Sequence, residues 1–416
     1  DARQRAAQSS LPCVAGCYRL AMNTATFIRQ HRTDDVRTLA LQAHRWPEVD
    51  MTFALSQIQG WQTARQKLPE WARRDDVWFP PHLSLEQCSS EATARYKCKV
   101  VERLLASDER QKGTLVDLTG GFGVDFSYMA RLFEKAVYVE QQERLCEVMR
   151  HNAACFGLQQ AEIVEGDGVA YLREQQDRVA LVYLDPARRD AHGSKTYAIK
   201  DCSPDVATLS DELVEKAQWV MIKLSPMLDW HAAVEEMKYV SEVHIVSVGG
   251  ECKELLLILR QEACDEKRLY CVNDDDVFAC AFSQIAIPVN MVDNLSSARW
   301  LYEPHASLMK GGCFGELAER YGVKGVGQNS HLFVSDKRVE GFPGRSFEIQ
   351  SIMSMNRKEV KTKLGGLTKA NVAVRNFPLT VVELRRRLHL KEGGNDYLFA
   401  TTVGTTHTLI LCKKQM

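Results

Sequence analysis

The fold is indicated most clearly by the sequence TLVDLTGGFGVD at residues 114–125. This stretch opens as an apolar strand and turns at three glycines, after which residues 126–133 have the apolar spacing of a helix. Glycines lack the Cβ atoms that block close approach to the backbone, and they permit positive φ. The N-terminus of the following helix points unpaired N–H groups at the same place. The stretch therefore predicts a nucleotide-type pocket at the C-terminal end of a strand.

Glu140 is the candidate ligand for a ribose. It ends the strand-like run at 135–140, 23 positions after Asp117, which is the spacing at which a βαβ unit presents an acid to ribose hydroxyls. The dinucleotide pattern G-x-G-x-x-G is not met, because Phe126 stands where the third glycine belongs. An NAD(P) enzyme is therefore the poorer interpretation. Taken alone, Glu140 is equally well explained as a solvated strand end.

Two later strand-like runs also end in acids. The first, at 161–165, is followed by Asp167 between two glycines, and the second, at 180–184, is followed by Asp185. Asp167 taken singly has a structural alternative, since Asp is a favoured helix N-cap. Four consecutive strand ends that carry acids or glycines predict a shared ligand site more strongly than any one of them.

The spaced series resembles motifs I to IV of the class I S-adenosylmethionine-dependent methyltransferases. In that family the glycine turn faces the methionine part of the cofactor, the acid after the second strand binds the ribose, and the acid after the third strand lies near the adenine. The resemblance implies an α/β fold with a Rossmann-like seven-stranded sheet and S-adenosyl-L-methionine as the cofactor. The candidate cofactor-binding residues are Asp117, Thr119, Gly121, Gly123, Glu140 and Asp167.

Three further apolar runs complete such a sheet. They lie at 219–226, 242–248 and 254–260, and the last two are separated by Gly249 and Gly250, a hairpin signal. A final antiparallel hairpin on an otherwise parallel sheet is what the class I methyltransferase fold has. The near-continuous apolar runs also indicate strands buried on both faces.

Composition and charge exclude several classes of protein. The chain has 416 residues, of which 45% are hydrophobic and 26% charged, which is ordinary for globular proteins and excludes a disordered class. Thirteen cysteines without any C-x-x-C pair predict reduced thiols, no zinc site and a cytoplasmic protein. No apolar run approaches a membrane span. Val14 to Cys17 weakly resembles a lipoprotein cleavage site, but the apolar core before it is too short and is broken by Pro12.

Positive charge is concentrated near the C-terminus. Residues 357–416 hold twelve Lys and Arg against four acids, whereas the whole chain has a net charge of −1. A basic patch on an otherwise acidic protein is typical of a phosphate-backbone binder, and a solvated helix face is the alternative. The candidate RNA-binding residues in this part are Lys369, Arg375, Arg385, Arg386 and Arg387.

The chain as a whole resembles a bacterial family of class I methyltransferases with a C-terminal ferredoxin-like segment and a THUMP-like domain. The more specific marks are DLTGGFG at 117–123, DPARR at 185–189, KLSPM at 223–227 and LTKAN at 367–371. THUMP domains bind RNA, chiefly tRNA, so the resemblance implies an RNA partner, tRNA or rRNA.

Five parts of the chain are expected from the helical spacing at the start, the alternation of strands and helices in the middle, and this resemblance. They are a disordered extension at 1–21, an N-terminal helical domain at 22–98, a methyltransferase domain at 99–262, a ferredoxin-like α+β segment at 263–344 and a THUMP-like RNA-binding domain at 345–416.

The chemistry of methyl transfer requires mainly that the acceptor lone pair be aligned with the methyl carbon. Asp185 lies where a carboxylate accepts a hydrogen bond from an amine. Base-methylating enzymes typically show Asp/Asn-Pro-Pro-aromatic here, with the ring stacked on a flipped base. This chain has Ala187 and Arg188 instead, so stacking would come from the guanidinium or from Tyr197. The candidate catalytic residues are Asp185, Pro186 and Arg188, and the candidate substrate-binding residues nearby are Arg189, Tyr197 and Lys223.

Two alternatives remain for the arginine pair at 188–189: phosphate binding, or an ion pair with Asp190 or Asp201. Methylation at C5 of a pyrimidine needs a cysteine nucleophile, and Cys202 is the only nearby candidate, so a base nitrogen is the preferred acceptor. The sequence thus predicts an S-adenosylmethionine-dependent RNA methyltransferase. A protein or small-molecule methyltransferase and a non-catalytic RNA-binding protein are the alternatives.

Overall fold

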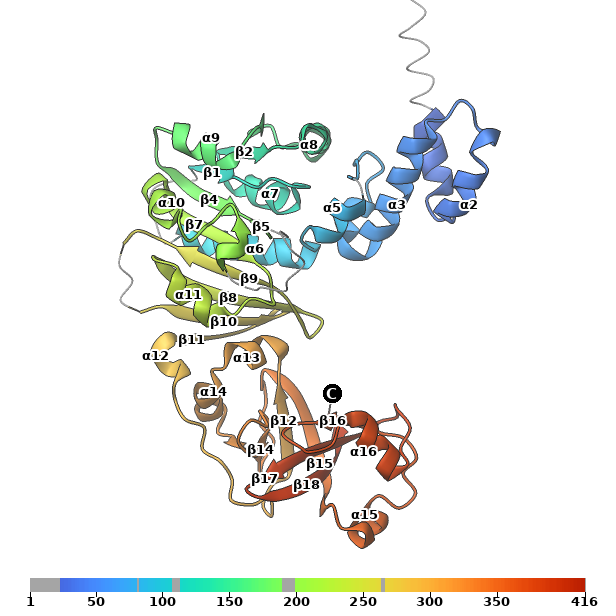
Figure 1. Ribbon diagram of the computed structural model, residues 1–416, viewed down its shortest axis with the longest axis vertical. Helices are drawn as coiled ribbons and strands as arrows, with labels where there is room; N and C mark the ends of the chain where they lie inside the picture. The colour runs from blue at the N-terminus through green and yellow to red at the C-terminus, as the bar shows by residue number, and fades with distance from the viewer. Residues whose placement is uncertain (1–22, 81, 107–112, 189–198, 263–265, 416) are drawn as a thin grey trace, which may run out of the picture. The chain divides into compact units, whose positions relative to one another are not determined.

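The computed structural model describes residues 23–80, 82–106, 113–188, 199–262 and 266–415. The chain divides into two compact units, Asp1–Lys223 and Leu224–Met416, each of which is described by itself (Figure 1). The extension expected at residues 1–21 lies outside the described residues.

Helices open the first unit, as the apolar spacing predicted. Three of them start at capping side chains, since Asp35 accepts the N–H of Thr38 at 2.8 Å, Asp50 that of Phe53 at 3.0 Å and Ser90 that of Thr93 at 3.2 Å. Residues 23–31 are helical, and the helices that follow them include α2 (Val36–Leu41), α3 (Met51–Lys67), α4 (Pro69–Ala72), α5 (His82–Gln87) and α6 (Glu91–Ala106).

Helix α4 and the segment that follows it pack against the glycine turn. Trp71 is 2% exposed and belongs to the same buried cluster as Phe79 and Phe122. The ring centroids of Trp71 and Phe122 are 5.0 Å apart. Apolar contacts therefore fix the position of the turn against the helical part of this unit.

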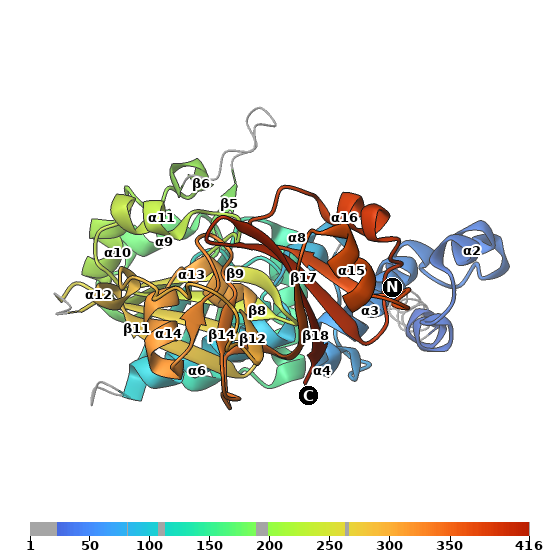
Figure 2. The same cartoon turned by 90° about the horizontal axis from the view of Figure 1, so that it is seen from below.

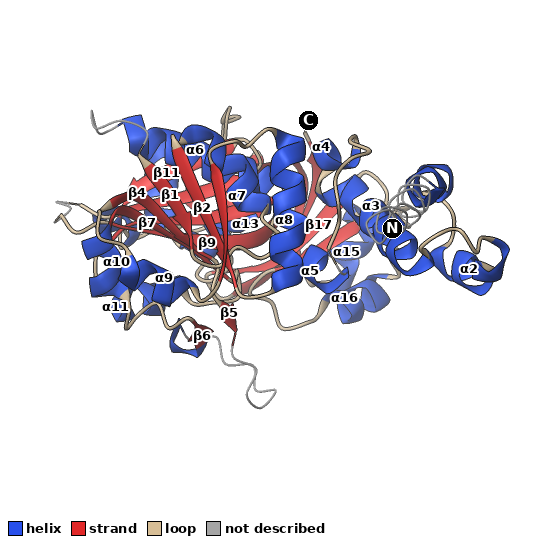
Figure 3. Cartoon of the chain, turned by 90° about the horizontal axis from the view of Figure 1, so that it is seen from above, coloured by secondary structure: helices blue, strands red, loops and turns tan. Residues whose placement is uncertain are grey.

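Five parallel strands form the centre of the first unit, in the hydrogen-bonded order β7-β4-β1-β2-β3. Every residue of the fourth apolar run is buried, as expected for a strand covered on both faces. The strands are β1 (Thr114–Asp117), β2 (Lys135–Glu140), β3 (Ala161–Glu165), β4 (Val179–Leu184) and β7 (Ala217–Leu224). The helices between them are α7 (Val124–Met129), α8 (Glu143–Phe156), α9 (Gly168–Glu174) and α10 (Ser210–Lys216). Figure 3 shows α6, α7 and α8 on one side of these strands and α9 and α10 on the other.

The expected antiparallel hairpin is present in the second unit. β8 (Val240–Val248) and β9 (Glu251–Leu259) pair antiparallel, and the turn between them needs glycine because φ is +60° at Gly249 and +80° at Gly250. The complete strand order of the mixed sheet is β11-β10-β8-β9-β7-β4-β1-β2-β3. This arrangement confirms the predicted fold class.

Two strands extend the sheet past the predicted seven. β10 (Arg268–Asn273) pairs parallel with β8, and β11 (Asp276–Ala281) pairs antiparallel with β10. The methyltransferase domain was expected to end at residue 262, and these two strands of the same sheet come after that residue. Periodicity alone did not reveal this, because a short apolar run carries no information about which strand it will pair with.

A second sheet of seven strands occupies the rest of this unit, in the order β13-β14-β12-β15-β18-β17-β16. Its strands are β12 (Trp300–Pro304), β13 (Lys324–Gly325), β14 (Phe333–Ser335), β15 (Gly344–Ser354), β16 (Asn371–Val374), β17 (Asp396–Val403) and β18 (Thr406–Lys414). Within it, β17 and β18 form an antiparallel hairpin. Figure 2 shows α15 (Arg357–Lys363) and α16 (Val381–Leu388) beside β17, and Leu364 and Leu384 join the buried cluster there.

A glycine divides the helical segment at 306–321. The segment 306–321 forms two helices, α13 (Ala306–Gly311) and α14 (Phe314–Tyr321), because Gly312 adopts a left-handed conformation with φ of +75° and ends the first. Two short helices complete the unit, α11 (Trp230–Glu236) and α12 (Phe282–Ile285). Within the described ranges, no helix combines the length and the apolar character that crossing a membrane requires.

Candidate active site

The glycine turn after β1 leaves its backbone accessible at one point. Gly121 has φ of +55°, and a Cβ built on it would have only the carbonyl oxygen of Thr119 within 4 Å, at 3.7 Å. The space beside this residue is therefore open. The turn is closed elsewhere by backbone bonds, since the N–H of Gly120 donates to the carbonyl of Val139 at 2.9 Å.

Glu140, at the end of β2, is bonded to this turn. Its Oε2 accepts the N–H of Gly121 at 2.8 Å, and its Oε1 accepts the N–H of Gln142 at 2.9 Å. The hydroxyl of Tyr138 donates to the carbonyl of Gly121 at 2.5 Å, which ties the same two segments. A carboxylate has about four acceptor positions, so two bonds leave room for ribose hydroxyls. The Glu140 carboxylate thus holds the glycine turn in place, and it can still accept hydrogen bonds from a ligand.

Asp117 lies at the end of β1 and is buried. It is 1% exposed, and burial raises its pKa well above the ordinary value, although the N–H of Thr119 donates to its Oδ1 at 3.0 Å. The Thr119 hydroxyl oxygen in turn accepts the N–H of Asp185 at 2.6 Å. Thr119 therefore connects the C-terminal ends of β1 and β4.

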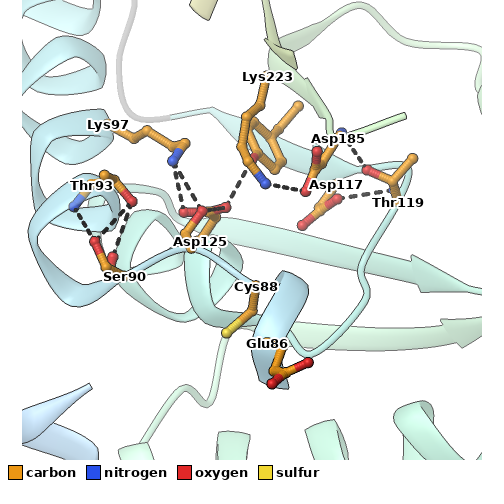
Figure 4. Close-up of polar contacts among 12 residues, drawn as sticks. Glu86, Cys88, Ser90, Thr93, Lys97, Asp117, Thr119, Asp125, Asp185 and Lys223 are labelled. Atoms are coloured by element: carbon orange, nitrogen blue, oxygen red, sulfur yellow. Dashed lines mark hydrogen bonds and ion pairs between the residues drawn. The ribbon is translucent and has the colours of Figure 1, made fainter. Parts of the chain in front are cut away.

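Asp185 is paired with Lys223. The Nζ of Lys223, near the end of β7, contacts Oδ2 of Asp185 (Figure 4). The lysine side chain is 13% exposed and the aspartate side chain 37% exposed, so the carboxylate is the group open to solvent. Sequence reasoning assigned Lys223 to the substrate, and the structure places it on the candidate catalytic acid.

The third strand end has a different arrangement. Asp167 caps α9, because its Oδ1 accepts the N–H of Ala170 at 2.9 Å, and its Oδ2 accepts the side-chain amide of Gln141 at 2.8 Å. The alternative of a helix cap is therefore realised. Gln141 directly follows Glu140, so this bond also links the ends of β2 and β3.

The loop after β4 is only partly described. Pro186 is buried, and Arg188 lies in the short strand β5 (Ala187–Arg188), which pairs antiparallel with β6 (Cys202–Ser203). Arg189 and Tyr197 lie outside the described residues.

Two buried charged residues beside this site were missed by sequence reasoning. Lys97 on α6 is fully buried, with Nζ 3.2 Å from Oδ1 of Asp125 on α7. Oδ2 of Asp125 accepts the hydroxyls of Ser89 at 2.7 Å and Tyr183 at 2.8 Å. Burial raises the pKa of Asp125, but Lys97 and Lys223 outweigh this and hold it below its ordinary value.

A signal for Lys97 was present in the sequence. Ala94, Lys97, Val101 and Leu104 recur at helical spacing, and all four are buried on one face of α6. A lysine on an apolar face implies a buried acidic partner, although the pattern does not say which acid supplies it.

Comparisons with known proteins agree with this geometry. A family model of THUMP-domain-like segments matches residues 344–414, and one of ferredoxin-like domains matches residues 300–343. The crystal structure of a candidate methyltransferase from Porphyromonas gingivalis W83 is similar over 96% of this chain and 99% of its own, with 29% identity and a TM-score of 0.84. This chain joins a class I methyltransferase fold to a ferredoxin-like segment and a THUMP-like domain. The resemblance inferred from the motifs is thereby confirmed.

More distant structures match only part of the chain. An rRNA methylase from Streptococcus thermophilus covers 40% of this chain and 96% of its own at 14% identity and a TM-score of 0.31. A candidate RNA methyltransferase from Pyrococcus horikoshii covers 35% of this chain and 63% of its own, at 19% identity and a TM-score of 0.26. Similarity at this level does not bear on the substrate. The comparison with curated proteins gives no match.

The THUMP-like domain divides the cations that were predicted to bind RNA. Arg375 is paired with the buried carboxylate of Glu303, with its Nη2 2.8 Å from Oε1. Arg385 pairs with Glu392 at 3.1 Å. The remaining members, Lys369, Arg386 and Arg387, are exposed. Two of the five predicted residues are thus engaged within the fold, and three present their charge to solvent.

Proposed function

We propose that this protein is an S-adenosylmethionine-dependent methyltransferase. One observation carries the proposal: the Glu140 carboxylate is fixed by two backbone N–H groups beside the open Gly121 backbone, where parallel strands end. The acceptor capacity left on Glu140 suits ribose hydroxyls, and the space beside Gly121 lets a ligand reach the main chain. The residues present therefore fit this cofactor, and Asp117, Thr119, Gly121, Gly123, Glu140 and Asp167 would hold it.

S-adenosylmethionine, when bound, supplies an electrophilic methyl group. The protein then has to orient the acceptor. Asp185 is placed to accept a hydrogen bond from an acceptor N–H and to aim the nitrogen lone pair. Lys223 restricts the Asp185 side chain to one position, because their ion pair forms on the Oδ2 side and leaves Oδ1 for the substrate. Asp185 is accordingly proposed as the catalytic residue and Lys223 as its positioning residue.

The acceptor is proposed to be a base nitrogen of RNA, in tRNA or rRNA. The THUMP-like match and the exposed cations of that domain support an RNA substrate. C5 methylation would need a thiolate nucleophile. Cys202, the only cysteine near Asp185 in the sequence, is buried, which makes it a poor candidate for that nucleophile.

Two measurements test this proposal. Calorimetry should show binding of S-adenosylmethionine at one site and weaker or no binding of NAD, and tighter binding of NAD would remove the methyltransferase assignment. Mass spectrometry of RNA nucleosides should show one methylated base missing in cells that lack the protein and restored by the wild-type gene. Restoration by a gene carrying Asp185→Ala would contradict the assigned role of Asp185. An unchanged nucleoside profile would favour a protein or small-molecule acceptor.

A further inference from the structure

A cavity of about 460 Å³ lies in the second unit where the ferredoxin-like and THUMP-like matches meet. The lining residues 338–342 belong to the first match, and the lining residues Arg345 and Lys414 belong to the second. The floor is thus built by the start of β15 and the end of β18, which are neighbours in the sheet.

The charged lining of this cavity is mainly cationic. Arg338, Arg345 and Lys414 line it, against the single acid Glu340. Arg338 and Lys414 are exposed and have no carboxylate within ion-pair distance among the described residues. The guanidinium carbon of Arg338 lies 5.7 Å from the ring centroid of Trp300, so its contact is with an aromatic face and its charge is not neutralised.

Arg345 is held in place by a buried acid. Its Nε donates to Oε2 of Glu303 at 2.8 Å, and its Nη2 contacts the same oxygen. The Glu303 side chain is 5% exposed, and its other oxygen accepts Arg375 at 2.8 Å. One carboxylate therefore serves two arginines, and the group keeps a net positive charge. The Nη1 of Arg345 remains available for a ligand, on a side chain that is 44% exposed.

These features suit a phosphate group. A guanidinium held by a buried acid loses less side-chain freedom on binding than a mobile one, and its planar N–H groups match the oxygens of a phosphate. The two unpaired cations next to it add charge without needing a defined geometry.

We propose that this cavity binds a phosphate group of the RNA backbone. The proposal rests on the RNA substrate proposed above and assigns a site of which two cations, Arg338 and Arg345, lie outside the basic segment 357–416. Arg338, Arg345 and Lys414 are the ligands, and Glu303 is the residue that positions Arg345.

The test compares two double variants that each remove one arginine and one lysine. Arg338→Ala/Lys414→Ala removes the unpaired cations of the cavity. The control, Arg268→Ala/Lys324→Ala, removes two exposed cations elsewhere in the same unit. The probe is a fluorescein-labelled single-stranded RNA of mixed sequence, titrated with the full-length protein at several salt concentrations.

The cavity variant should bind at least about tenfold more weakly at low salt, because it loses two charge-assisted phosphate contacts. Its log–log salt slope should become shallower by about 0.7, which is the change expected when one phosphate is no longer neutralised. The control should bind like the wild type. Thermal unfolding of each variant checks that the fold is retained, and Arg338→Gln/Lys414→Gln replaces the alanine pair if it is not.

Each other outcome is informative. Wild-type-like binding by the folded cavity variant would overturn this site and leave the RNA substrate in place. Equal losses in the cavity and control variants would show a general charge effect and also overturn the site. No RNA binding by the wild type would remove both the site and the RNA substrate. Competition by AMP or inorganic pyrophosphate as strong as that by RNA would identify a free nucleotide or phosphate as the ligand instead.

Discussion

Lys223 and Asp185 form an ion pair between the C-terminal ends of two neighbouring parallel strands, β7 and β4. The two residues are 38 positions apart in the sequence, and the sheet order brings them together. The lysine is the more buried partner, so it holds the aspartate from the interior and leaves the carboxylate facing solvent.

Lys223→Met should therefore lower the rate of methyl transfer without weakening the binding of S-adenosylmethionine. Loss of a charge-assisted hydrogen bond of about 1.5–3 kcal/mol corresponds to a rate about 10–100-fold lower. Single-turnover transfer from radiolabelled S-adenosylmethionine measures the rate, and calorimetry measures the affinity. Lys223→Arg should recover part of the rate, because it keeps the charge. A normal rate in Lys223→Met would show that the pair is structural only.

Glu140→Ala should weaken binding of S-adenosylmethionine by about 1–3 kcal/mol, since both ribose acceptor positions are lost. The same change also frees the N–H groups of Gly121 and Gln142, so the free energy of unfolding should fall slightly. Calorimetry and urea unfolding measure the two effects. Glu134→Ala, an exposed position just before the other end of β2, is the matched control. Unchanged cofactor affinity in Glu140→Ala would remove Glu140 from the site.

Asp117→Asn should stabilise the protein relative to the wild type as the pH rises. Burial raises the pKa of Asp117 in the folded state, so the folded protein keeps this proton at pH values where the unfolded chain has lost it. Above the unfolded pKa of about 3.9, stability therefore falls with rising pH until the folded pKa is passed. Asparagine does not titrate, so the variant does not lose stability in this way as the pH rises. Urea unfolding between about pH 4 and pH 8 measures the difference, and a difference that is constant with pH would contradict the prediction.

Lys97→Met should lower the free energy of unfolding by about 3–5 kcal/mol, because it leaves the Asp125 carboxylate buried without its charged partner. Urea denaturation measures the change. Lys99→Met, on the exposed face of the same helix, is the control and should change stability by no more than about 0.5 kcal/mol. The double variant Lys97→Met/Asp125→Asn should be less destabilised than the sum of the two single variants. Additive losses would show that the two residues are not coupled.

Arg386→Ala/Arg387→Ala should make the salt dependence of RNA binding shallower by about 1.4 in log–log slope, if each arginine neutralises one phosphate. Arg385 is left in place because it already pairs with Glu392. The measurement uses the labelled RNA described above, with Arg268→Ala/Lys324→Ala as control. Cofactor affinity should not change. A slope equal to that of the wild type would assign the α16 arginines to a solvated face.

The sequence was sufficient to place the acids at strand ends, because the end of an apolar run is a local feature. Asp117, Glu140 and Asp185 were located in this way, and the strand order confirms the fold they indicated. The partners of these acids were not predictable. Lys223 reaches Asp185 only because β7 lies next to β4, and that neighbourhood is a property of the folded sheet.

Long-range ion pairs limited the predictions in the same way. Arg375 was grouped with other cations by position in the chain, but its partner Glu303 is 72 residues earlier and is buried. Similarly, nothing near Lys97 in the sequence marks Asp125, which lies on another helix. A local charge count therefore predicts the sign of the charge on a surface better than it predicts which residues form that surface.

The antiparallel pairing of β12 with β15 joins the ferredoxin-like and THUMP-like segments within one sheet, from Trp300 opposite Glu348 to Pro304 opposite Gly344. A fragment that started at residue 344 would expose the backbone N–H and C=O groups of β15 along this whole edge. Such an edge is a template for pairing with other chains, and aggregation is the expected result. A fragment that started before β12 would keep the edge paired. The two segments thus match separate families but fold as one sheet. Neither is therefore expected to be stable when it is cut from the other.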